Sequence, residues 1–118
     1  MALIHAYRSR GLTRDITVQD AAGATIAVGT NDKIRARIGR LGAAALFSVE
    51  SGTDTANGSS FQKNFNADHE NRLRLDAADL ALLDAGVYTL YVDLFDNADS
   101  EEWKTISRQC FSLEDSDV

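Results

Sequence analysis

Hydrophobic and polar residues alternate along most of this chain, as they do in strands that bury one face. The clearest run is 33–38, in which Ile34, Ala36 and Ile38 alternate with basic residues. Further extended segments, separated by turn residues, cover 14–19, 24–28, 46–50, 60–64, 72–76, 88–95 and 102–113. These eight segments predict an all-β fold class.

Residues 72–86 predict a strand, one helical turn and a sharp corner. Leu73 and Leu75 alternate with charged residues, so they share one face of the strand. Leu80 and Leu83 have the spacing of neighbours on one side of a helical turn. The pattern therefore lays all four leucines against a sheet.

Asp84, Gly86 and Tyr88 form a structural corner before the next strand. In immunoglobulin-type sandwiches a tyrosine at this position hydrogen-bonds to the backbone just upstream. Leu90 and Val92 continue the parity of Tyr88. We therefore predict an immunoglobulin-like antiparallel two-sheet β-sandwich with one short helical turn between two strands.

The ends of the chain and its last strand are less regular. Residues 1–118 are expected to form a single β-sandwich domain, with a flexible arm at about 1–8 and an acidic tail at about 114–118. In the last strand Ile106 is out of phase with Phe111, which predicts a β-bulge between them.

Composition narrows the class of protein. The chain has 118 residues, a net charge of −6 and a single cysteine, so no intrachain disulfide is possible. It shows neither a long apolar span nor a signal peptide, so we expect no membrane association and synthesis in the cytoplasm. The acidic charge argues against nucleic acid as the main partner.

The charge is unevenly distributed along the chain. Residues 1–40 carry seven Lys or Arg and three Asp or Glu, a net +4. Residues 41–118 carry five and fifteen, a net −10. This polarity either reflects solvated faces or orients copies of the chain in a homo-oligomer.

No arrangement of residues predicts catalysis. His5 and His69 belong to no motif with a nucleophile or a second metal ligand. Five acidic residues could offer oxygen ligands to Ca²⁺, but they lack the spacing of a calcium-binding loop. They are Asp93, Asp96, Asp99, Glu101 and Glu102. We expect no catalytic residues, no cofactor and no metal.

Two pairs of residues are candidates for partner contact. Arg35 and Arg37 belong to a basic stripe that is either a solvated outer face or an electrostatic contact with an acidic neighbour. Phe61 and Phe65 lie in polar surroundings, where they either cap the core or anchor a partner.

Trp103 is the fifth candidate for partner contact. Together with Tyr91 and Tyr7 it could instead line a groove for a ligand. A carbohydrate- or ligand-binding β-sandwich module is therefore the alternative function.

Several segments together resemble the immunoglobulin-like domains of tailed-bacteriophage and prophage virion proteins, such as the N-terminal domain of baseplate upper proteins. The segments are Arg-Asp-Ile-Thr-Val at 14–18, Lys-Ile-Arg-Ala-Arg-Ile at 33–38, Ser-Gly at 51–52, Leu-Arg-Leu at 73–75, Leu-Leu-Asp-Ala-Gly-Val-Tyr at 82–88, Val-Asp-Leu-Phe-Asp at 92–96 and Gln-Cys-Phe-Ser-Leu at 109–113. Those domains typically end with Gly-x-Phe-x-Val, where this chain has Cys-Phe-Ser-Leu. The resemblance extends over about residues 12–113.

The resemblance implies a non-enzymatic structural role in the virion. It implies a homo-oligomer that docks onto capsid, neck, tail or baseplate proteins, with neither nucleic acid nor a membrane as partner. Because no stalk or receptor-binding domain follows Val118, we expect a small adaptor, or a capsid cement or decoration subunit.

Overall fold

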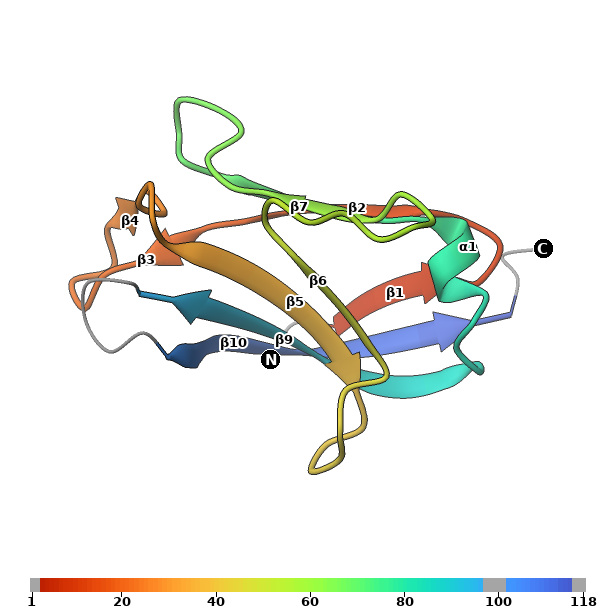
Figure 1. The fold of residues 1–118 in the computed structure, drawn as a ribbon. Coiled ribbons are helices and arrows are strands. Elements are labelled where there is room, and N and C mark those ends of the chain that lie inside the picture. Colours follow the sequence, from red (N-terminus) through yellow and green to blue (C-terminus); the bar gives the residue numbers. More distant parts are fainter. Residues whose placement is uncertain (1–2, 97–101, 116–118) are drawn as a thin grey trace.

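The computed structural model describes residues 3–96 and 102–115, which form two facing β-sheets and a small separate hairpin (Figure 1). The elements are β1 (Leu3–Tyr7), β2 (Leu12–Ile16), β3 (Val18–Gln19), β4 (Thr25–Ile26), β5 (Lys33–Gly39), β6 (Phe47–Glu50), β7 (Ser60–Gln62), β8 (Asn71–Leu75), α1 (Ala77–Leu80), β9 (Gly86–Phe95) and β10 (Trp103–Glu114). The predicted all-β class is confirmed.

The larger sheet has five strands in the order β1-β10-β9-β5-β6, and the smaller has three in the order β2-β8-β7. Neighbouring strands are antiparallel except β1, which runs parallel to β10. Strands β3 and β4 pair with each other as a separate hairpin. In Figure 1 the three-stranded sheet lies above the five-stranded sheet as a second layer.

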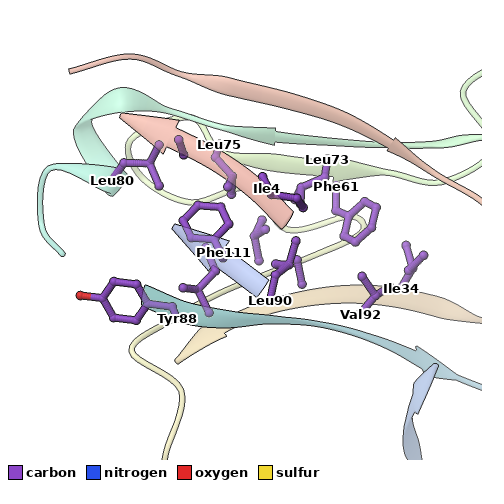
Figure 2. Packing of buried hydrophobic residues seen from close by; sticks show 14 of the residues in the cluster. Ile4, Ile34, Phe61, Leu73, Leu75, Leu80, Tyr88, Leu90, Val92 and Phe111 are labelled. Atoms are coloured by element: carbon purple, nitrogen blue, oxygen red, sulfur yellow. The ribbon is translucent and has the colours of Figure 1, made fainter. Parts of the chain in front are cut away.

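The hydrophobic core fills the space between the two sheets (Figure 2). Leu90 and Val92 of β9 face Leu73 of β8, and all three side chains are fully buried. Leu80 of α1 covers one end of this core. Removing these apolar side chains from water is the main force that holds the sheets together.

The segments with the strictest alternation fold as predicted. Every second residue is buried in positions 33–38 of β5 and throughout β8, and the residues between them face outward. The corner also has the expected hydrogen bond, because the Tyr88 hydroxyl donates to the Asp84 carbonyl oxygen at 2.6 Å. Figure 2 shows this hydroxyl pointing out of the core while the ring stays in it.

Two predicted strands are shorter than expected. The segment 14–19 divides at Thr17 into β2 and β3, because β2 pairs with β8 whereas β3 pairs with β4. The segment 24–28 keeps only the two residues of β4. Ile26 is consequently 40% exposed, although its alternation with Val28 predicts burial.

The N-terminal arm needs a correction, because residues 3–7 form strand β1. Ile4 pairs with Phe111 and Ala6 pairs with Leu113 in the register with β10, and both N-terminal side chains are buried. Hydrophobic burial at the edge of the large sheet therefore orders a segment that we expected to be flexible.

The predicted bulge in the last strand occurs between Thr105 and Ser107, slightly before the expected position. It places Trp103 on the side of the sheet opposite to Phe111 and Leu113, which are in the core. Residues 97–101 of the acidic loop and 116–118 of the acidic tail lie outside the described residues.

Candidate functional site: an arginine–aspartate cluster

Strands β5, β9 and β10 gather polar and aromatic residues on the outer face of the five-stranded sheet, the side turned away from the core. Arg35 lies opposite Asp93, and Arg37 lies opposite Tyr91. On the other side of β9, Thr105 lies opposite Asp93. Because directly opposed residues project to the same face, three strands bring these side chains together.

Asp93 is the centre of the group and is only 1% exposed. Its Oδ2 accepts hydrogen bonds from Nε of Arg35 at 2.9 Å and from Nε of Arg37 at 2.5 Å. Its Oδ1 accepts from Nη2 of Arg37 at 3.1 Å and from the Thr105 hydroxyl at 2.8 Å. The carboxylate is therefore fully engaged by fixed donors.

Aromatic rings cover both guanidinium groups. The Arg35 guanidinium carbon lies 4.1 Å from the centre of the Trp103 ring, and that of Arg37 lies 4.6 Å from the centre of the Tyr91 ring. Phe95 packs against Trp103 with ring centres 5.5 Å apart. Both arginine contacts are within cation–π range. We call Arg35, Arg37, Tyr91, Asp93, Trp103 and Thr105 the arginine–aspartate cluster.

The charges of the cluster stabilise one another. Burial raises the pKa of Asp93, but hydrogen bonds from Arg37, Thr105 and Arg35 outweigh burial and leave it below its usual value. The hydrogen bond to Asp93 raises the pKa of Arg37. The cluster thus stays ionised at neutral pH, with two guanidiniums around one carboxylate.

This arrangement leaves both arginines accessible at the surface. The side chains of Arg35 and Arg37 remain 25% and 27% exposed, so they can contact a partner while Asp93 holds them in place. Side chains that are fixed before association lose less conformational entropy on binding. The cluster is therefore a preorganised surface patch.

The structure brings together three of the five predicted contact residues, namely Arg35, Arg37 and Trp103. Phe61 is 2% exposed and belongs to the core, so its interpretation as a partner anchor is wrong. Phe65 is partly buried in the loop between β7 and β8, with the Arg72 guanidinium carbon 4.0 Å from its ring centre. The two phenylalanines therefore form no common surface.

Asp93 and Thr105 are members of the cluster that sequence reasoning did not assign to it. The sequence places Asp93 with Asp96 and Glu102 as a possible calcium ligand, but the Asp93 oxygens accept from arginine and threonine donors instead. Asp99 and Glu101 of that group lie outside the described residues. The sequence signal for this pairing is an acidic residue inside an otherwise apolar strand, together with two arginines on another strand that could donate to it.

A second buried carboxylate, Asp79, has a structural role. It accepts hydrogen bonds from the hydroxyls of Thr55 and Ser59 at 2.6 and 2.5 Å and from Asn57 at 2.9 Å. Burial raises the pKa of Asp79, but these hydrogen bonds lower it by more, so the pKa lies below its usual value. Asp79 therefore ties the loop before β7 to helix α1.

Neither histidine belongs to the cluster. His5 is on β1, with Nδ1 3.8 Å from Oε1 of Glu114, and His69 is exposed in the loop before β8. Within residues 3–96 and 102–115, no group of three or more metal-ligating side chains is close enough to hold an ion. An open pocket of about 470 Å³ lies near Phe61 and is lined by neither histidine nor cysteine.

Comparison with known proteins adds no identification, because neither the family models nor the curated proteins searched match this chain. In the part of the chain that the structure describes, no helix has the length and apolar character needed to cross a membrane.

Proposed function

We propose that this chain is a non-enzymatic structural subunit of a bacteriophage virion that acts through protein–protein contacts. Its place would be that of a capsid cement or decoration protein, or of an adaptor in the neck, tail or baseplate. The outer face of the five-stranded sheet is its docking surface. The partners are other virion proteins and further copies of the same chain.

The immunoglobulin-like part of this proposal is supported by strand order. In immunoglobulin domains a G-F-C sheet, extended by C′ in the variable type, faces a sheet that contains strands B, E and D. Strands β10, β9, β5 and β6 follow the first order, and β2, β8 and β7 follow the second. The Tyr88 hydroxyl bond lies at the start of β9, where such domains have their tyrosine corner.

The observation that carries the docking role is the arginine–aspartate cluster. Burying a carboxylate costs free energy unless the charge is paired and hydrogen-bonded, as Asp93 is by its three donor side chains. The cluster places this arrangement on an outer sheet face, with two arginines and two aromatic rings still in reach of solvent. Arginine, tryptophan and tyrosine are the residues most enriched in the energetic centres of protein interfaces.

The virion role is tested by asking whether the protein is part of particles. Phage particles are purified by density gradient from bacteria that carry the gene, and the chain is quantified by mass spectrometry relative to the major capsid protein. We expect the chain in the particle band at a fixed ratio to capsid protein, with a host cytosolic protein as the control. Recovery only in the soluble fractions would overturn the proposal.

A ligand-binding module is the second candidate, since Trp103 and Tyr91 lie on the same outer face. Tyr7, the third aromatic considered for such a groove, is instead on edge strand β1 opposite Glu114. Binding to a glycan array that is lost in Trp103→Ala, but retained in a Tyr7→Ala control, would favour this module over the virion subunit.

A further inference from the structure

We propose that the arginine–aspartate cluster binds an acidic segment of a partner protein through the edges of Arg35 and Arg37 that Asp93 does not occupy. This inference rests on the proposed docking role of the same face and specifies the chemistry of its occupant. Three features of the protein support it: the donors that Asp93 leaves unoccupied, the charge of the surrounding face and the charge of the whole chain.

Asp93 occupies only one edge of each arginine. It accepts hydrogen bonds from Nε and Nη2 of Arg37, and both Nε and Nη2 of Arg35 approach its Oδ2 at 2.9 Å. Neither Nη1 has a hydrogen-bond partner among the described residues, and neither is buried without one. Both Nη1 groups therefore keep N–H donors that no described residue uses.

The cluster is also unbalanced in charge. One carboxylate faces two guanidiniums, which leaves a net charge of +1 at the centre of the patch. Charge-assisted hydrogen bonds from arginine to carboxylate are among the strongest polar contacts in proteins. An incoming Asp or Glu would thus balance the charge of these three residues and accept from donors that Asp93 leaves unoccupied.

The strand residues around the cluster strengthen this positive character. Register places Lys33 opposite Phe95, and the exposed Arg108 opposite Tyr91, on the same face. Glu50, opposite Arg35, is the one acidic residue that the described neighbouring strand adds there. Among the described strand residues the patch is therefore positive, and its aromatic rings supply apolar contact area beside the cations.

The charge of the whole chain indicates which anionic macromolecule fits. A net charge of −6 repels a long polyanion such as nucleic acid, whose phosphates continue past the patch. A short acidic stretch of a protein can meet the patch alone, because charges beyond about 8 to 10 Å are screened at physiological ionic strength. The observations therefore favour an acidic protein segment.

The test uses Trp103, the single tryptophan of the chain, as an internal reporter. A short peptide of repeated Glu–Ser pairs is titrated into the whole protein while Trp103 fluorescence is followed, with a Gln–Ser peptide as control. We expect a saturable change with the Glu–Ser peptide that weakens as salt is added. No change with this peptide, or tighter binding of a single-stranded oligo-dT, would overturn the inference.

Two variants locate the site. Arg35→Gln leaves Asp93 paired with Arg37, so the protein stays folded while the excess charge disappears, and affinity should fall by about tenfold or more. Arg72→Gln removes a cation from the opposite sheet and should leave affinity unchanged, whereas Arg35→Lys should restore part of it. Equal affinity in Arg35→Gln and the parent protein would contradict the proposal.

The outcome is separable from that of the virion experiment. Peptide binding by a protein that is absent from particles would retain the acidic partner and reject the virion role. Presence in particles without peptide binding would do the reverse.

Discussion

The two outer faces of the sandwich carry the same three residue types but differ in how deeply the carboxylate is buried. On the three-stranded sheet, Arg72 stacks on Phe65 and donates to Asp15 from Nε at 3.0 Å and from Nη2 at 3.3 Å. On the five-stranded sheet, Arg35 and Arg37 stack on aromatic rings and share Asp93. Each face thus combines a carboxylate, a guanidinium fork and an aromatic ring.

Burial and stoichiometry separate the two groups. The side chains of Arg72 and Asp15 are 45% and 33% exposed and pair one to one, so water competes for every contact. The Asp93 side chain is 1% exposed and serves two arginines. Exposed ion pairs contribute little to stability, whereas a buried charge depends strongly on its partners. The difference shows that burial and stoichiometry, and not residue type alone, decide how strongly such a group depends on its partners.

Removing the central carboxylate should have the largest effect. Asp93→Ala leaves two guanidiniums facing each other without a counter-charge, and we expect a loss of about 3 to 5 kcal/mol in the free energy of unfolding. The matched variant Asp15→Ala should melt with the parent protein, since its pair is exposed. Urea denaturation of both variants measures the difference, and equal destabilisation would erase the contrast between the two faces.

Acid should weaken the protein through its buried carboxylates. The pKa values of Asp93 and Asp79 are lowered in the folded state, so the unfolded chain binds protons more readily. The stability they contribute is complete above the unfolded value of about 3.9 and is lost as pH falls through the lower folded values. Thermal melting should therefore fall below about pH 4 in the parent protein, and Asp15→Asn should show the same decline. A flat profile would contradict the pKa directions.

The hydrogen bond of the corner tyrosine is neutral, and losing it should have an effect between those expected for the two charged groups. Tyr88→Phe keeps the buried ring but leaves the Asp84 carbonyl without its 2.6 Å donor. We expect a loss of about 1 to 3 kcal/mol, measured by denaturation with an unchanged denaturant dependence. An unaltered midpoint would show that the corner is held by ring packing alone.

The exposed group should give the smallest effect. Arg72→Gln removes both the ion pair with Asp15 and the stacking on Phe65, yet water can replace each contact. We expect no measurable change in melting temperature. A marked destabilisation would mean that exposure is a poor guide to the worth of these contacts.

Local periodicity was sufficient for the parts of the fold whose signal lies within one segment. Strand β5 alternates over positions 33–38, and the leucines of β8 and α1 have the spacing that burial requires. The corner at Tyr88 was also predictable because its hydrogen bond spans four residues.

The rest depends on contacts between distant segments. Strand β1 has only Ile4 and Ala6 on its inner face, and it is ordered by pairing with β10, more than 100 residues later. The cluster depends on β5 lying beside β9 and on a bulge that turns Trp103 outward. Periodicity identifies which face of a strand a residue occupies, but not which strand is its neighbour.

Photo-crosslinking within assembled particles tests the central claim that the outer face of the five-stranded sheet is the docking surface. A benzophenone amino acid replaces Trp103 in one variant and Phe65 on the opposite sheet in the control, and cross-linked peptides are identified by mass spectrometry. We predict that position 103 links to an acidic segment of another virion protein and that position 65 does not. Cross-links from position 65 alone, or none from position 103, would contradict this account.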